Sequence, residues 1–186
     1  MASTIRGNDN FDSAGPFGAS TLISDNVSVG TGATFSVSFS GNYRAYRLIL
    51  NGIYSNSNFQ QLVWRYTDGS GNNMTASNTY AFQYAMSDYT LRKTNDDRMT
   101  IPEYYRQIYS TERAYIDMVI YNPKSSTEVT TQKGTFWFGI DNYYSGNFTS
   151  QVTSQTYGIG ANNSIYFYHS QGGNFSGGTY SLWGLN

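Results

Sequence analysis

Apolar and polar side chains alternate along most of the chain after residue 20. In 35–39, for example, Phe35, Val37 and Phe39 fall on one side of an extended segment, and two serines fall on the other. A period of two is typical of a β-strand with one buried and one solvated face. The same pattern predicts further strands at 43–53, 59–66, 79–86, 114–121, 136–140, 148–156 and 165–168.

These segments follow one another at the spacing of about 8 to 12 residues that is typical of sandwiches and barrels. They predict an all-β fold, an antiparallel β-sandwich of jelly-roll type with about ten strands. Gly- and Asn-containing turns at 40–42 and 68–73 are expected to reverse the chain. The second of these would make 79–86 the hairpin partner of 59–66. Segment 43–53 has large apolar residues on both faces and is expected to be central.

The last stretch, 174–186, alternates in the same way. Gly177 and Gly178 suggest a turn, after which Tyr180 and Leu182 alternate with Ser181 and Trp183. An apolar strand left unpaired would be a site of aggregation, so we expect this one to lie inside a sheet, between earlier strands.

The inward positions of these strands form the expected core. They are Phe35, Val37, Leu48, Leu50, Leu62, Trp64, Ile116, Met118, Phe136, Phe138, Phe167 and Leu182.

One segment, 87–112, lacks the alternation and is expected to form a long loop. It is rich in charges of both signs, and structureless connections of this length are usually functional or disordered. Pro102 is placed to begin one or two helical turns. Ligand binding and packing against a neighbouring subunit both remain open for this loop.

Residues 1–19 are too irregular for a helix or a long strand and are expected to form an N-terminal arm ahead of a sandwich domain, 20–186. Ile5, Phe11 and Phe17 are its apolar residues, placed to contact a neighbouring subunit or another assembly partner. A frayed terminus is the alternative.

Composition narrows the possible functions. The 186 residues suffice for one domain with a full core. Charged residues make up 12% and the formal net charge is −1, which argues against nucleic acid as a partner. The absence of cysteine excludes zinc fingers and cysteine enzymes. No apolar run is long enough for membrane insertion, and no secretory signal follows Met1, so synthesis in a cytoplasm is expected.

No residue pattern argues for catalysis, and we expect no enzyme activity and no cofactor. His169 is the only histidine, with Ser170 beside it and no nucleophile-elbow pattern around a serine. Asp96, Asp97 and Glu103 are the carboxylates to consider for glycoside hydrolysis, but neighbouring basic residues favour solvated loop charges. No metal site is expected, because no calcium-loop pattern occurs.

Tyrosine is abundant, and aromatic rings beside amides and hydroxyls suit both sugars and protein interfaces. The candidate ligand-binding residues are Tyr104 and Tyr105 in the long loop, and Tyr143 and Tyr144 in an expected turn at 141–147. Tyr54 with Phe59 is a further candidate pair. Packing between subunits is an equally good interpretation of these tyrosines.

Both ends of the chain resemble a known family. The ending Ser176-Gly-Gly-Thr-Tyr-Ser-Leu-Trp-Gly-Leu185 and the opening Met1-Ala-Ser-Thr-Ile-Arg-Gly-Asn-Asp-Asn-Phe-Asp12 resemble small all-β structural proteins of tailed bacteriophages, known as tail or tail-fibre proteins. The resemblance is confined to these two ends of the chain.

This resemblance implies a virion protein, most simply a tail-fibre or receptor-binding component. It further implies self-association, with a homotrimer expected, together with contacts to other virion proteins and to a host surface glycan or protein. The alternatives are a capsid decoration protein and, outside virions, a carbohydrate-binding module. A hydrolase of surface glycan is a weaker third.

Overall fold

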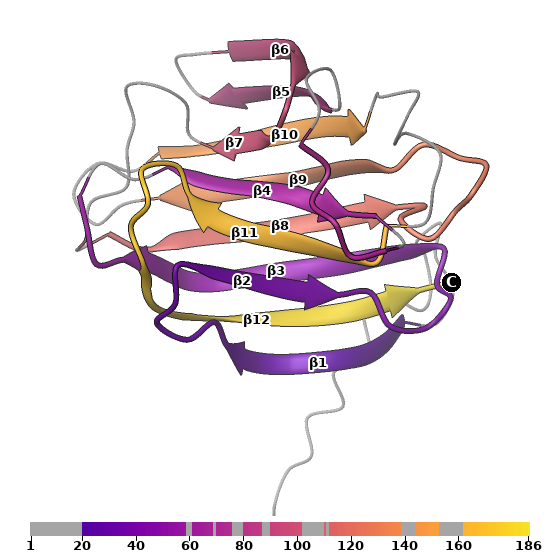
Figure 1. Ribbon diagram of the computed structural model, residues 1–186, viewed down its shortest axis with the longest axis horizontal. Coiled ribbons are helices and arrows are strands. Elements are labelled where there is room, and N and C mark those ends of the chain that lie inside the picture. Colours follow the sequence, from indigo (N-terminus) through magenta and orange to yellow (C-terminus); the bar gives the residue numbers. More distant parts are fainter. Residues whose placement is uncertain are drawn as a thin grey trace, which may run out of the picture.

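The computed structural model describes residues 20–58, 61–68, 70–75, 80–86, 90–101, 110, 112–138, 144–152 and 162–186. This part of the chain contains strands and no helix (Figure 1). The strands are β1 (Ser20–Ser28), β2 (Thr34–Ser38), β3 (Ala45–Ser55), β4 (Leu62–Thr67), β5 (Tyr80–Met86), β6 (Thr90–Asp96), β7 (Met99–Ile101), β8 (Ala114–Tyr121), β9 (Thr131–Phe138), β10 (Tyr144–Val152), β11 (Ser164–His169) and β12 (Phe175–Leu185).

These strands form two antiparallel sheets. The larger sheet has eight strands in the order β1-β12-β3-β8-β9-β10-β5-β6, and the smaller has four in the order β2-β11-β4-β7. The smaller sheet lies against the middle of the larger one (Figure 1). The expected all-β antiparallel sandwich is therefore confirmed, with twelve strands in the described residues where about ten were expected.

Most hydrogen-bonded neighbours are far apart in the sequence. β12 lies between β1 and β3, and β11 lies between β2 and β4. The expectation that the 174–186 stretch is inserted between earlier strands is confirmed, because β12 pairs with Ser20–Ser28 on one side and with β3 on the other. β3 is central as expected, with β8 on its second edge.

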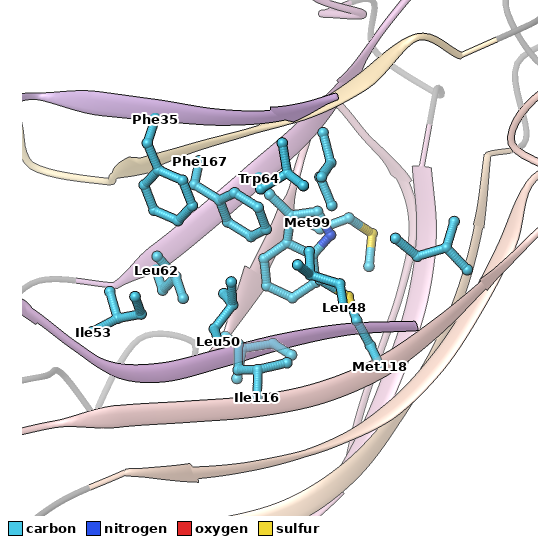
Figure 2. Packing of buried hydrophobic residues seen from close by; sticks show 14 of the residues in the cluster. Phe35, Leu48, Leu50, Ile53, Leu62, Trp64, Met99, Ile116, Met118 and Phe167 are labelled. Carbon is cyan, nitrogen blue, oxygen red and sulfur yellow. The ribbon is translucent and has the colours of Figure 1, made fainter. Parts of the chain in front are cut away.

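The core fills the space between the sheets. All twelve residues expected there are buried, the most exposed being Phe35 at 8%. Figure 2 shows Phe35, Phe167 and Trp64 pointing from the smaller sheet toward side chains of the larger sheet such as Leu50. The rings of Phe35 and Phe167, cross-strand partners on β2 and β11, stack with centroids 4.7 Å apart.

The expectation of one long loop over 87–112 is wrong in two places, because β6 and β7 lie within it. β6 is an edge strand of the larger sheet, and among the described strands it pairs with β5 alone. Edge strands commonly carry charges that prevent pairing with other chains, and Arg92 and Lys93 on β6 obscure the alternation for that reason. β7 has three residues, all buried, which is too short for a period to be visible. The helical turn expected at Pro102 lies outside the described residues.

The expected hairpin between 59–66 and 79–86 is also wrong. The turn itself forms: the Asp68 side chain accepts hydrogen bonds from the backbone N–H groups of Ser70 and Asn72. The returning chain lies beside β4 at Asn73 and Met74, and the N–H of Met74 donates to the carbonyl of Tyr66. β5 then belongs to the other sheet and pairs with β10 and β6. Local turn chemistry was predictable, whereas the choice of partner depended on distant strands.

The 40–42 turn likewise connects the two sheets rather than two neighbouring strands of one sheet. β2 lies in the smaller sheet and β3 in the larger. The Tyr46 hydroxyl lies close to the carbonyls of Ser40 (3.0 Å) and Gly41 (2.9 Å) and donates to this turn. The Tyr46 ring is fully buried against Phe39, so one side chain secures both the turn and the core.

Gly177 and Gly178 do not form the expected turn. They lie inside β12, where its register with β3 shifts, and have φ values of 156° and 110°. A β-carbon at Gly178 would lie 2.8 Å from the Cα of Ile53 and 2.9 Å from the carbonyl oxygen of Gly52. The pair therefore forms a bulge at which two backbones approach closely.

The arm at 1–19 lies outside the described residues, so Ile5, Phe11 and Phe17 have no structural outcome; β1 begins at Ser20. No helix able to cross a membrane occurs in the part of the chain that the structure covers.

Gly184 in β12 has a specific packing role. A β-carbon there would collide with the ring of Tyr43, which lies over this glycine and edge-on to Tyr46, with 5.7 Å between the two ring centroids. The glycine in the Leu182-Trp183-Gly184-Leu185 ending is thus required by a ring packed on the backbone.

We predict that Gly184→Ala lowers the free energy of unfolding by about 1–3 kcal/mol, because the added methyl group displaces the Tyr43 ring. Urea denaturation measures the change. In a Tyr43→Ala background the same substitution should cost much less, since the obstructing ring is gone. An equal cost in both backgrounds would contradict the steric explanation.

Candidate functional site

Most of the tyrosine residues expected to bind ligand lie beyond the part of the chain that the structure describes. Tyr104, Tyr105 and Tyr143 lie outside the described residues. Tyr144 is the first residue of β10, so the expected turn at 141–147 is replaced by strand from Tyr144 onward. The side chain of Tyr144 lies outside the described residues.

Tyr54 on β3 packs against Arg113, and the expected partner Phe59 lies outside the described residues. The guanidinium carbon of Arg113 is 3.6 Å from the centroid of the Tyr54 ring. A β-carbon at Gly177 would lie 2.6 Å from the same ring, so the ring rests on the β12 bulge. The Tyr54 ring is thus packed against both Arg113 and the β12 bulge.

The carboxylates considered for glycoside hydrolysis form ion pairs. Asp97 lies 2.5 Å from Arg65 and 3.8 Å from Arg98, and Asp96 lies 3.7 Å from Lys93. Partial burial favours the neutral form of Asp97, but its hydrogen bond with Asp96 and the arginine charges outweigh burial and lower its pKa. A carboxyl group held ionised in this way is a poor proton donor. Glu103 lies outside the described residues.

His169 ends β11 and is 3% exposed. Its ring packs against Phe175, with 4.3 Å between centroids, and neither ring nitrogen has a hydrogen-bond partner among the described residues. Burial lowers its pKa to about 4, although the backbone of Gln61 opposes this shift. His169 is therefore neutral near pH 7. The described residues contain no cluster of three or more histidine or acidic side chains that could hold a metal ion.

A groove lies on the outer face of the larger sheet, the face turned away from the smaller sheet. It crosses β3, β8 and β9, has a volume of about 340 Å³ and is open to solvent. Because side chains alternate along a strand, the inward neighbours Leu50, Ile116 and Phe136 fill the core. The outward side chains lining the groove are Ile49, Asn51, Tyr115, Asp117, Thr135 and Trp137. We call this set the outer groove.

Two aromatic rings form one side of the outer groove. Tyr115 and Trp137 are direct cross-strand partners on β8 and β9. Their ring centroids are 4.9 Å apart and the ring planes are inclined by 53°. Tyr115 is 37% exposed and Trp137 is half-buried, so the pair presents ring surface to solvent while remaining fixed by its neighbours.

Polar groups lie beside these rings. Asp117 accepts two hydrogen bonds from Arg47, at 2.9 Å from Nε and 2.6 Å from Nη2. The bond to Asp117 raises the pKa of Arg47, so the guanidinium stays charged. Asn51 and Thr135 are exposed, and their side chains form no hydrogen bond within the described part of the chain. The groove thus combines an aromatic wall with an anchored carboxylate, a free amide and a free hydroxyl.

The sequence interpretation placed candidate tyrosines in loops and missed this groove. A signal was present at Phe136-Trp137-Phe138. Since Phe136 and Phe138 both point inward, the alternation of a strand requires the large Trp137 ring to face outward. The alignment of Trp137 with Tyr115 could not be read from the sequence, because it depends on the register between β8 and β9.

Comparison with known proteins returned no match of this chain to a family model, a curated protein or a solved structure.

We predict that the stability of the protein falls as the pH drops from about 6.5 toward 4. The pKa of His169 is about 4 when folded and 6.5 in a model peptide, so the unfolded chain binds the proton first. Neutral His169 contributes fully to the free energy of unfolding above pH 6.5. Roughly 2–3 kcal/mol of this free energy is lost between pH 7 and pH 4.5.

The measurement is urea denaturation at several pH values for the parent and for His169→Phe. The variant should lose this part of the pH dependence while keeping the part due to carboxylates. Identical pH dependence in the two proteins would show that His169 titrates normally in the folded state.

Proposed function

We propose that this protein is a structural component of a bacteriophage virion, belonging to the tail-fibre or receptor-binding apparatus and contacting the host surface. The resemblance at residues 1–12 and 176–185 supports the assignment to a virion. The single structural observation that supports a binding role is the outer groove, in which Tyr115 and Trp137 present ring surface to solvent beside Asp117. Large side chains partly exposed and held in place are a common feature of recognition surfaces.

The strand order supports the finer proposal that the sandwich is a jelly roll. With β5, β6, β9 and β10 set aside, the other eight strands form two rows of four, β1-β12-β3-β8 and β2-β11-β4-β7. Jelly rolls have eight strands in two facing sheets. The four remaining strands extend the first row past β8, and the outer groove lies where this extension begins.

A receptor-binding role needs only weak individual contacts. A site with a dissociation constant near 1 mM corresponds to about 4 kcal/mol, and several copies acting on one surface raise the effective affinity by roughly 10²- to 10⁴-fold. We therefore propose that the protein is a homo-oligomer, most simply a trimer, and that the arm at 1–19 contributes both to the contacts between copies and to attachment to other virion proteins.

We predict that an antibody raised against the purified protein labels the tail or its fibres on phage particles that carry this coding sequence. Immunogold electron microscopy of purified particles measures the position. Labelling over the capsid surface would favour the decoration alternative. Unlabelled particles, with the protein present only in the soluble fraction of the lysate, would contradict a virion role and favour a free carbohydrate-binding module.

We also predict that the purified full chain has three times the 20.8 kDa mass of one copy when measured by light scattering after size exclusion. A variant with Ile5, Phe11 and Phe17 all changed to Ala tests whether the arm makes the contact, and we expect a smaller assembly at the same concentration. A matched variant, Val129→Ala, removes an exposed apolar side chain of the sandwich and should leave the mass unchanged. A monomer for the full chain at high concentration would contradict the proposed self-association.

A further inference from the structure

We propose that the outer groove is a binding site for one neutral pyranose ring, stacked on Trp137 and Tyr115 and hydrogen-bonded by Asp117 and its neighbours. This inference names the ligand class for the surface contact and so rests on the proposed function. It places the binding residues on the strands of the larger sheet and not in the loops where the sequence suggested them.

The first argument is the arrangement of the rings. The face of an aromatic ring is negatively polarised, and it attracts the positively polarised C–H groups that cover a face of a sugar ring. Trp137 and Tyr115 are inclined by 53° at a centroid distance of 4.9 Å. Such a pair contacts a puckered ring on two sides, whereas a flat ligand can stack on only one of the two rings. Their cross-strand pairing fixes the angle, so little ordering is needed on binding.

The second argument is the set of polar groups. Each oxygen of Asp117 accepts one hydrogen bond from Arg47 and has lone-pair capacity left for a second donor. The carboxylate is fixed by Arg47 and still 41% exposed, so it is oriented and accessible to neighbouring hydroxyls of a sugar. Asn51 can donate and accept, and so can the Thr135 hydroxyl. Sugar hydroxyls need both kinds of partner.

The third argument is charge and size. Asp117 is the charged residue that lines the groove, and Arg47 neutralises it, so the lining favours neither an anionic nor a cationic ligand; Lys133, on the same face, lies over the ring of Tyr121 instead. The volume of about 340 Å³ is at the small end of ligand sites, which span about 300–1,000 Å³. This size suits one sugar ring with solvent access for the rest of a glycan. A stable contact with a second copy of the chain would need about 800 Å² from each partner. The nine residues that line the groove are far fewer than the roughly 20–30 residues that each partner supplies to such a contact.

The experiment titrates the purified full chain with methyl glycosides of glucose, galactose, mannose and N-acetylglucosamine, with methyl glucuronide as the anionic comparison. Saturation-transfer NMR detects binding, and tryptophan fluorescence gives the affinity. We expect at least one neutral glycoside to bind with a dissociation constant in the millimolar range, and to bind more tightly than the glucuronide.

Two groove variants and two controls locate the site. Trp137→Ala and, separately, Tyr115→Ala should each weaken binding by about tenfold or more, and Trp137→Phe should stay within about threefold of the parent because it keeps a ring. Tyr166→Ala is the matched control: Tyr166 is a partly exposed tyrosine on β11, beside Tyr168 with ring centroids 5.7 Å apart, in the other sheet. It should bind like the parent. Circular dichroism melting shows whether each variant is folded. If Trp137→Ala is unfolded, Tyr115→Ala is the variant that tests the site.

Three results would overturn the inference. The first is that no neutral glycoside binds at concentrations up to about 100 mM, and the second is unchanged affinity in a folded groove variant. The third is a change of oligomeric mass in the groove variants, because it would identify this face as a contact between copies of the chain. Immunogold labelling on virions remains a separate readout. Labelled tails without glycoside binding would support the virion role and contradict the sugar site alone. Glycoside binding by a protein absent from virions would support the sugar site and contradict the virion role.

Discussion

Aromatic contacts between the two sheets are the interaction on which the rest of the structure depends. Phe35 of the smaller sheet meets Phe175 of the larger edge-on, with centroids 4.8 Å apart, and Trp64 meets Phe148 at 5.8 Å. Phe39, just after β2, packs on Tyr46 of β3 at 5.0 Å. Each buried ring removes roughly 150–250 Å² from water, and edge-on pairs add to that gain. A chain with only 12% charged residues and no cysteine is held together by this apolar layer.

The alternation that fills this layer also determines the outer surface. Once Ile116 and Phe136 point inward, their neighbours Tyr115 and Trp137 must point outward, on strands whose register is held by the core. A site built on sheet strands is held more rigidly than one built on loops, because its side chains are positioned by packing from below. The core therefore fixes the geometry of the outer groove. The pair formed by Arg47 and Asp117 is held beside the groove by the pairing of β3 with β8.

The sequence predicted which residues face inward better than it predicted which strands pair. Every expected core residue is buried, since alternation is a local property of the strand. The pairing of β5 with β10, and not with β4, depends on segments some sixty residues away, and no local pattern records that choice. β6 escaped prediction because Arg92, Lys93 and Asp96 interrupt its alternation, and edge strands commonly carry such charges. The groove was not predicted because, like the pairings, it depends on the register between strands. Trp137 could be recognised as outward-facing from the sequence, but its cross-strand partner could not be identified.

The position of β12 has a consequence for synthesis of the protein. The slot between β1 and β3 is filled by the strand made after all the others described, so β3 leaves the ribosome well over a hundred residues before its partner at Tyr180 and Leu182. At about 5–20 residues per second, the edge of β3 waits for several seconds or longer. During that interval Leu48 and Leu50 have no finished core, and an exposed apolar edge is open to the wrong partner. Wrong pairing between nascent chains is therefore most favoured in the interval before Phe175–Leu185 has been made.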